Sequence, residues 1–166
     1  MATAAEYKAR ILSYVQGKDP VAVQRETPQV LARLVEGVPS DRLKTRPAAD
    51  KWSVSELMAH FAEAEMGAFW RYRQMIEHNG CPLPSYDQEL WSRLGDYPSQ
   101  DPRESLQLFT LLRQANLRMF ERLTPEEWQR HGVHTERGEM SVRDLAAQIA
   151  GHDLNHLMQV RGILGK

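Results

Sequence analysis

Four long stretches of this 166-residue chain repeat apolar residues at the spacing of an α-helix. They begin near Asp19, Ser53, Asp101 and Ser141, and in each the apolar side chains recur every three or four residues. No segment alternates apolar and polar residues for long enough to predict a β-strand. Because an amphipathic helix must bury its apolar stripe against other elements, the pattern predicts an all-α four-helix bundle, with at least one long crossover connection.

Capping signals set the boundaries of these helices. Asp19-Pro20 and Asp101-Pro102 each combine an N-cap residue with proline at the first helical position. The second long helix opens with a serine followed three residues later by glutamate, the spacing of a capping box. The sequence therefore predicts long helices over 20–36, 54–78, 102–123 and 142–164, with shorter helical segments over 4–16 and near 40–43 and 125–128.

The length and composition are those of one globular domain spanning residues 1–166. Hydrophobic residues make up 42% of the chain, charged residues 26%, and the net charge is −1. The absence of a large basic block argues against nucleic acid or an anionic membrane as a partner. A single cysteine, Cys81, excludes an internal disulfide and fits a reducing compartment. With no charged-then-apolar leader and no long apolar run, we expect a soluble cytoplasmic protein.

The last long helix contains two histidines four residues apart, His152 and His156. Four residues correspond to a rotation of about 400°, so the two imidazoles lie roughly 40° apart around the helix and one turn along it. Two neutral imidazoles in this relation can bind one metal ion. His156 falls within the apolar stripe and His152 beside it, where a polar side chain costs stability unless something satisfies it.

Two protein ligands do not complete a metal site, which usually has at least three. His60, early in the second long helix and beside its apolar stripe, is the best candidate among the other histidines. The alternative is that the histidines are core polar residues bonded to neighbours such as Glu65 and Asn116. A site of three imidazoles would suit zinc or nickel, and also iron or manganese.

Two carboxylates and one further histidine are candidates for supporting roles. Asp153 and Glu65 could each accept the free ring N–H of a ligand histidine, or act as a general base toward water or a thiol. The alternative is that Asp153 pairs with an arginine and that Glu65 reaches solvent at the bundle end. His134, in the loop before the last helix, could act as an acid or contact the substrate, although a surface histidine is the commoner case.

Several motifs, in this order and at these separations, resemble those of the DinB-like superfamily, in particular its YfiT-like branch of metal-dependent enzymes. They are Lys51-Trp52-Ser53-Val54 leading to His60, Tyr86-Asp87-Gln88-Glu89-Leu90-Trp91 in the central loop, and Gly132-Val133-His134 running into His152-Asp153-Leu154-Asn155-His156. The resemblance spans nearly the whole chain. It implies a four-helix bundle with an unusual connection order and a divalent metal held by His60, His152 and His156. Relatives of this kind include thiol S-transferases that use thiols such as bacillithiol, a thiol-dependent maleylpyruvate isomerase, and proteins labelled hydrolases.

Together these features predict a divalent-metal-dependent enzyme that acts on a small electrophilic substrate, as a thiol S-transferase or a hydrolase. The ion would lower the pKa of a bound water toward about 7, or deprotonate a bound thiol. Asp153 and His134 are the candidate catalytic residues. We expect a small-molecule substrate, a low-molecular-weight thiol and a homodimer as partners. The alternative is a non-catalytic metal-binding or stress-response and interaction module of the same fold, in which any metal is structural.

Overall fold

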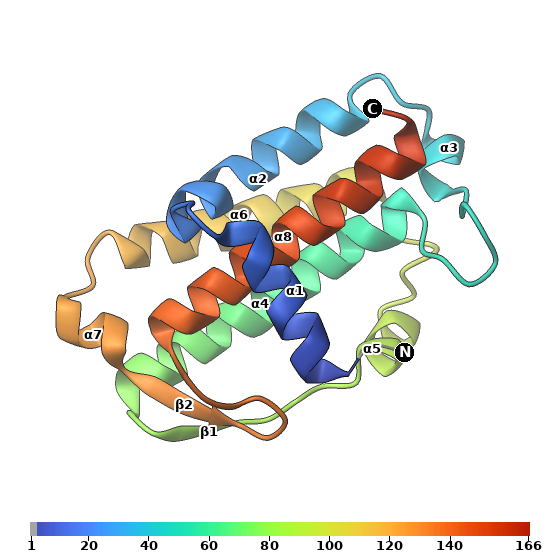
Figure 1. Cartoon of the computed structure of the whole chain (residues 1–166). Coiled ribbons are helices and arrows are strands. Elements are labelled where there is room, and N and C mark those ends of the chain that lie inside the picture. Colours follow the sequence, from blue (N-terminus) through green and yellow to red (C-terminus); the bar gives the residue numbers. More distant parts are fainter. Residues whose placement is uncertain (1–2) are drawn as a thin grey trace.

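The computed structural model describes residues 3–166, and four long helices form its body (Figure 1). They are α2 (Pro20–Val35), α4 (Val54–Glu77), α6 (Pro102–Phe120) and α8 (Val142–Leu164). The shorter helices are α1 (Ala4–Val15), α3 (Ser40–Lys44), α5 (Gln88–Leu94) and α7 (Pro125–Gln129). Each long helix begins at the residue that its capping signal predicts. None of the helices in this part of the chain is long and apolar enough to cross a membrane.

The four long helices are not arranged in the order of the sequence. The neighbours of α2 are α6 and α8, and the neighbours of α4 are also α6 and α8. The connections from α2 to α4 and from α6 to α8 therefore cross the bundle diagonally, whereas α4 and α6 are adjacent. In Figure 1 these helices run side by side, and α1 lies across α8. The predicted four-helix bundle with a long crossover connection is confirmed.

Three short strands at one end of the bundle are the part of the fold that the sequence pattern does not predict. They are β1 (Cys81–Leu83), β2 (His131–His134) and β3 (Gly138–Ser141). β1 pairs in parallel with β2, and β2 pairs antiparallel with β3. The sheet thus joins the α4–α6 connection to the segment that leads into α8. The expectation of no strands is wrong here, because strands of three or four residues are too short to show a period of two.

Apolar side chains fill the bundle in two clusters along its length. On α4, α6 and α8 one cluster includes Phe61, Phe109 and Leu157, and the other includes Tyr72 and Leu145. Between these two clusters, α4, α6 and α8 each carry buried polar side chains. The core is therefore divided by a polar layer, and this layer lies next to the candidate metal ligands.

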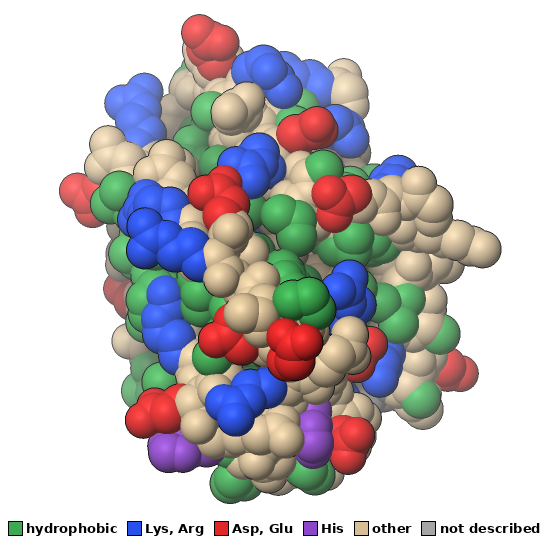
Figure 2. Space-filling view, turned by 90° about the vertical axis from the view of Figure 1, so that its left-hand side faces the viewer, with side chains coloured by type: hydrophobic (Ala, Val, Ile, Leu, Met, Phe, Trp, Pro, Cys, Tyr) green, Lys and Arg blue, Asp and Glu red, His purple; other side chains and the backbone are tan. Residues whose placement is uncertain are grey.

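Charged side chains are mixed on the side of the molecule that Figure 2 shows, where α7 lies. Acidic and basic groups alternate across this face, with apolar side chains in small groups between them. The mixture agrees with the net charge of −1. The expectation that nucleic acid and anionic membranes are not partners stays a prediction, and this face is in keeping with it.

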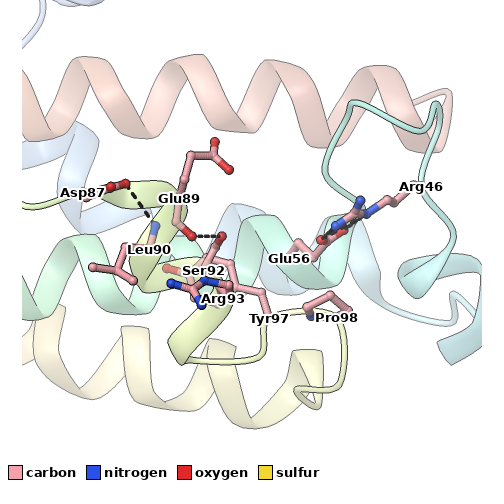
Figure 3. A pocket seen from close by; sticks show the side chains of 9 residues that line it. All are labelled: Arg46, Glu56, Asp87, Glu89, Leu90, Ser92, Arg93, Tyr97 and Pro98. Carbon is pink, nitrogen blue, oxygen red and sulfur yellow. Dashed lines mark hydrogen bonds and ion pairs between the residues drawn. The ribbon is translucent and has the colours of Figure 1, made fainter.

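The first turn of α4 is held in place by Glu56 (Figure 3). The Ser53 hydroxyl accepts a hydrogen bond from the Glu56 N–H, and the Glu56 carboxylate accepts one from the Ser53 N–H at 2.8 Å, which completes the capping box. The same carboxylate also accepts hydrogen bonds from the Arg46 guanidinium, with Nε 2.9 Å from Oε2. Burial would raise the pKa of Glu56, but the bonds from Arg46 and Ser53 outweigh it and hold the pKa below its usual value. These contacts fix the start of the helix that carries His60 one turn later.

Close packing of α1 on α8 depends on Gly151. A Cβ atom at this position would overlap the carbonyl oxygen of Ile11, which belongs to the α1 backbone and cannot move aside alone. The Ile11 side chain is itself buried where α1 packs on α8. The glycine therefore lets α1 cover the part of α8 where His152 begins the histidine pair.

We expect Gly151→Ala to destabilise the protein by about 1–3 kcal/mol, because the added methyl group forces α1 away from α8. Chemical denaturation measures the free energy of unfolding. Gly162→Ala is the matched control on the same helix, since a Cβ there meets open space, and it should be neutral or stabilising by up to about 1 kcal/mol. Equal effects of the two substitutions would contradict this role of Gly151.

We expect Glu56→Gln to lower the free energy of unfolding at pH 7 by about 1 kcal/mol, because glutamine keeps the cap but loses the charge that Arg46 binds. The pKa of Glu56 is lower in the folded state, so its contribution is complete above the unfolded pKa of about 4.3 and disappears as the pH falls through the folded value. Denaturation at several pH values should therefore show a constant gap between wild type and variant down to about pH 5 that narrows below pH 4. A gap that stays constant to pH 3 would show that the charge is not responsible.

Candidate metal centre

Three histidine side chains meet inside the bundle, as the sequence predicts. His60 comes from α4, and His152 and His156 come from α8. One ring nitrogen from each lies within 4.8 Å of the other two, and the Nε2 atoms of His60 and His152 are 2.8 Å apart. The ring centroids are 4.4–4.9 Å apart. His60 is 2% exposed and His156 is 8% exposed, while His152 is partly buried, so most of the cluster is shielded from bulk water.

The surroundings of the cluster favour neutral imidazoles with free lone pairs. Burial and the nearby His152 lower the pKa of His156 to about 3, and burial with the two neighbouring imidazoles lowers the pKa of His60 well below its usual value. His156 Nδ1 lies 2.8 Å from Gln159 Oε1, which can only accept, so Nδ1 carries the proton and Nε2 keeps its lone pair. Neutral imidazole nitrogens are the form that binds a divalent metal.

An unpartnered ring nitrogen gives a further sign that the cluster fits a metal. His152 Nδ1 is buried and, within residues 3–166, has no hydrogen-bond partner; the nearest carboxylate oxygen, Oδ1 of Asp153, is 3.7 Å away. In metal sites a carboxylate commonly accepts the N–H of the ring nitrogen that does not bind the metal. A small shift of the His152 ring would complete that bond while Nε2 stays directed at the cluster. The three nitrogen donors support a divalent metal, and they do not select one ion.

A buried arginine lies behind the histidines and holds two carboxylates. Arg113 Nη1 is 2.6 Å from Asp153 Oδ2, and Arg113 Nη2 is 2.8 Å from Glu65 Oε2. All three side chains are 1% exposed. Asn116 donates to the other Glu65 oxygen at 2.8 Å, and Arg113 donates to the Gln24 carbonyl at 2.8 Å. Burial would raise the pKa of Asp153, but the charge of Arg113 outweighs it and lowers that pKa.

This network shows where Asp153 and Glu65 lie, for which the sequence left alternatives open. Asp153 pairs with an arginine and also faces His152, so the two interpretations of Asp153 are compatible. Glu65 lies inside the bundle and does not reach solvent at its end. Glu65 and Asn116 bond to each other, not to the histidines, so the polar partners proposed for a metal-free core are already occupied.

A cavity of about 130 Å³ lies on one side of the cluster, and His134 is part of its wall. His60 and His152 line it, together with Arg71 from α4 and Arg137 from the β2–β3 turn. His134 is the last residue of β2 and is 4% exposed; its Nδ1 accepts a hydrogen bond from the Glu136 N–H at 3.1 Å. The sequence placed His134 in a loop, but the structure places it in a strand that faces the candidate site.

A wider cavity of about 610 Å³ lies beside His156. Trp52, Leu57 and Gln159 are part of its lining. Gln88, the first residue of α5, lines this cavity and also the smaller one. The histidine cluster therefore borders two spaces of different size, and α5 lies near both.

The central loop contributes a wall of the smaller cavity through an aromatic stack. Tyr86 lines the cavity and stacks on Trp91, with ring centroids 4.2 Å apart and an angle of 22° between the planes. Tyr86 and Trp91 belong to a motif that carries the family resemblance, whereas sequence reasoning missed Gln148 and Arg137. Gln148 could have been found from helical spacing, because it precedes His152 by four residues on α8. Arg137 lies in a tight turn whose position depends on the sheet, and no local pattern marks it.

A third cavity, of about 520 Å³, lies beside α5 and is a weaker candidate (Figure 3). Its lining includes Arg93, Tyr97 and the Arg46–Glu56 pair. The buried carboxylate of Glu56 is already satisfied by Arg46 and by the capping box. Since this cavity contains none of the three clustered histidines, the chemistry that the sequence predicts belongs to the other two cavities.

Comparison with known proteins gives relatives that match nearly the full length of this chain. The protein named "Putative metal-dependent hydrolase YfiT" from Bacillus subtilis is 25% identical over 165 residues, covering 96% of this chain and 93% of the relative. A "Putative metal-dependent hydrolase" from Geobacillus thermodenitrificans is 26% identical over 150 residues, covering 88% and 83%. The solved structure of Bacillus subtilis YfiT, described as having an unusual four-helix bundle topology, superposes with a TM-score of 0.81 at 20% identity and covers 98% of this chain and 88% of that one.

The family comparison agrees with the motifs and with the fold. The model of the DinB superfamily matches residues 25–160. This range contains all four long helices except the beginning of α2 and the end of α8. The match includes the positions of His60, His152 and His156. This chain therefore belongs to the DinB superfamily.

Proposed function

We propose that this protein is a divalent-metal-dependent enzyme that joins an activated nucleophile to a small electrophilic substrate, with His60, His152 and His156 as the metal ligands. The observation that carries the proposal is the set of three imidazoles whose nitrogens lie within 4.8 Å of one another beside two cavities. Three protein ligands leave a position for a reacting molecule, as in catalytic zinc sites. The names of the relatives as metal-dependent hydrolases support the same class of reaction.

The metal would supply charge, and the chain would supply its geometry. Held by His60, His152 and His156, a divalent ion would lower the pKa of water toward about 7 or favour the deprotonated form of a thiol. Zinc and nickel are the ions we propose first, with iron and manganese as alternatives, since imidazole suits all of them. The buried position of the cluster excludes bulk water and strengthens electrostatic interactions with the substrate.

The two cavities support thiol transfer ahead of hydrolysis. The cavity of about 610 Å³ beside His156 has room for a low-molecular-weight thiol as the nucleophile. In hydrolysis the nucleophile is water, which needs far less space. The cavity of about 130 Å³ beside His60 and His152 would then hold the electrophilic part of the substrate. We propose that His134, in the wall of that smaller cavity, contacts the substrate or gives it a proton.

We assign Asp153 a positioning role. Its carboxylate is held by Arg113 and faces His152 Nδ1, so it can accept a hydrogen bond from the ring N–H and keep the Nε2 lone pair of His152 directed at the cluster. The complete burial of Asp153 behind the histidines makes direct proton transfer from the substrate a less suitable role.

We also propose that the protein is cytoplasmic and forms a homodimer. Cys81 is the single cysteine of the chain and a free thiol, which fits the reducing conditions of the cytoplasm. Leu108 and Leu111 are exposed on α6 and offer an apolar face for a homodimer.

A metal-binding module without turnover is the alternative, and it would need a closed site of four ligands. Within the described chain the cluster has three ligand side chains, which favours the enzyme.

We expect the purified protein to bind about one divalent metal per chain, and His156→Ala to lose it, because two imidazoles bind a divalent ion far more weakly than three. Elemental analysis after reconstitution with zinc or nickel measures the metal content. His78→Ala is the matched control, since His78 is exposed at the C-terminal end of α4, and it should keep the metal. A metal-free wild-type protein, or equal metal content in all three proteins, would refute the site.

We expect the metal-loaded protein to catalyse transfer of a low-molecular-weight thiol to a small electrophile faster than hydrolysis of an activated ester. The larger cavity admits a thiol, and its nucleophilic form is stabilised at the site. Both rates should fall to the uncatalysed level in His156→Ala and stay unchanged in His78→Ala. If neither reaction is catalysed by protein that holds a full complement of metal, the non-catalytic alternative is correct.

We expect Asp153→Asn to weaken metal binding about 10–100-fold, because asparagine cannot hold the His152 ring as a carboxylate does. Glu65→Gln is the matched control: it removes a charge from the same Arg113 network but touches none of the histidines. Both variants should be less stable, since each leaves a buried charge poorly paired. Competition with a chelator measures the affinity. An equal loss of affinity in both variants would show that Asp153 acts only through general stability.

A further inference from the structure

Two half-buried arginines line the smaller cavity. Arg71 is half-buried on α4 and donates a hydrogen bond to the Pro84 carbonyl at 2.8 Å. Arg137 is half-buried in the β2–β3 turn and reaches the Gln148 side-chain oxygen at 3.4 Å. In the part of the chain that the structure describes, neither guanidinium forms an ion pair with a carboxylate. Each therefore keeps unused N–H groups and its full charge.

The two positive charges act on the same small space. Burial lowers the pKa of Arg71; the nearby Tyr86 opposes this shift, and the charge of Arg137 adds to it. Burial lowers the pKa of His134 as well, and both arginines add to that effect, while Glu136 opposes it. Glu136 lines the cavity but is exposed. The interior of the cavity is consequently electropositive even before a metal adds its own charge.

A buried amide side chain is also part of this wall. Gln148 is 2% exposed and lines the cavity, and among residues 3–166 its Nε2 group has no hydrogen-bond partner. A buried N–H donor without an acceptor is costly, and such groups commonly meet a ligand or water. Gln148 lies one turn before His152 on α8, so its donor and the metal ligand are on the same side of the helix.

The geometry points to an oxyanion site: we propose that Arg71, Arg137 and Gln148 bind a carboxylate or phosphate group of the substrate whose reacting atom lies at the histidine cluster. The inference rests on the proposed function and names its substrate class, a small electrophile that carries an anionic oxygen group close to the reactive centre. Guanidinium and amide N–H groups match the lone pairs of such a group. The positive charges of the two arginines disfavour a cationic ligand in this cavity. An apolar ligand would leave the N–H groups of the arginines without hydrogen-bond acceptors. The volume of about 130 Å³ has room for one group of this size beside the histidines.

The experiment follows the Gln148 side-chain amide by NMR during titration of the zinc-loaded protein. The probes are acetate, inorganic phosphate and acetamide, which has the shape of acetate without its charge. We expect acetate or phosphate to shift the Gln148 signal and acetamide to leave it unchanged, and the anion that binds more tightly indicates which oxyanion group the site prefers. A response to acetamide equal to that of the anions, or no response to either anion, would overturn the proposal.

The arginine variants separate this site from direct binding of the anion to zinc. Because a charge-assisted hydrogen bond commonly changes affinity about tenfold, we expect Arg71→Gln/Arg137→Gln to weaken anion binding at least about tenfold. Arg137→Gln alone, in the β2–β3 turn, provides a second variant in case the double variant does not fold. Arg118→Gln/Arg122→Gln is the matched control: it removes two exposed positive charges that do not line the cavity, and it should leave binding within about twofold. Equal weakening in the control and the cavity variant would overturn the proposal.

Metal content, measured on the same samples, distinguishes failure of the oxyanion site from failure of the proposed metal-dependent function. Zinc-loaded protein whose anion binding does not depend on the arginines would overturn the inference and leave the proposed function intact. Arginine-dependent anion binding in protein that takes up no zinc would support the oxyanion site while the proposed function fails.

Discussion

The ion network of Arg113 is the interaction on which the rest of the structure depends. One guanidinium, 1% exposed, holds carboxylates from α4 and α8 and comes itself from α6. Breaking one partner of such a buried pair strands the other charge in the core, which typically costs 3–5 kcal/mol. The network therefore fixes the relative positions of three long helices at the level of the histidines. It also places two carboxylates on one guanidinium, an excess of negative charge that a divalent cation at the adjacent histidines would offset.

Three side chains from two helices form the candidate centre because each helix starts at a defined residue. The Arg46–Glu56 pair and the capping box set the beginning of α4, and the α1–Gly151 contact sets the packing of α8. The imidazoles thus sit in a buried environment that lowers the pKa of His60 and of His156 and keeps both neutral. On either side of them the fold leaves a cavity, one lined by cationic groups and the other wide enough for a second reactant.

Much of this arrangement could be predicted from the sequence, and the misses have a common physical cause. Helix starts follow from local capping chemistry, so the first residues of α2, α4, α6 and α8 were predicted correctly. The histidine pair follows from helical spacing, and His60 from its place on an apolar face. The three strands and the position of Arg137 depend on pairing between segments far apart in the chain, which no short window of sequence reveals. The partners of Asp153 and Glu65 likewise depend on which helices are neighbours, and that is set by the diagonal connections.

X-ray absorption spectroscopy of the zinc-loaded protein tests the central claim most directly, because it counts the ligands of the metal in solution. Three imidazole nitrogens at about 2.0–2.1 Å, with one light ligand that is exchangeable, would be the result expected for a centre of His60, His152 and His156. In that case the histidines are the chain's metal ligands and an open position remains for chemistry. Coordination by fewer than three imidazoles, or by carboxylate oxygens in their place, would contradict the account and show that the cluster is a polar part of the core.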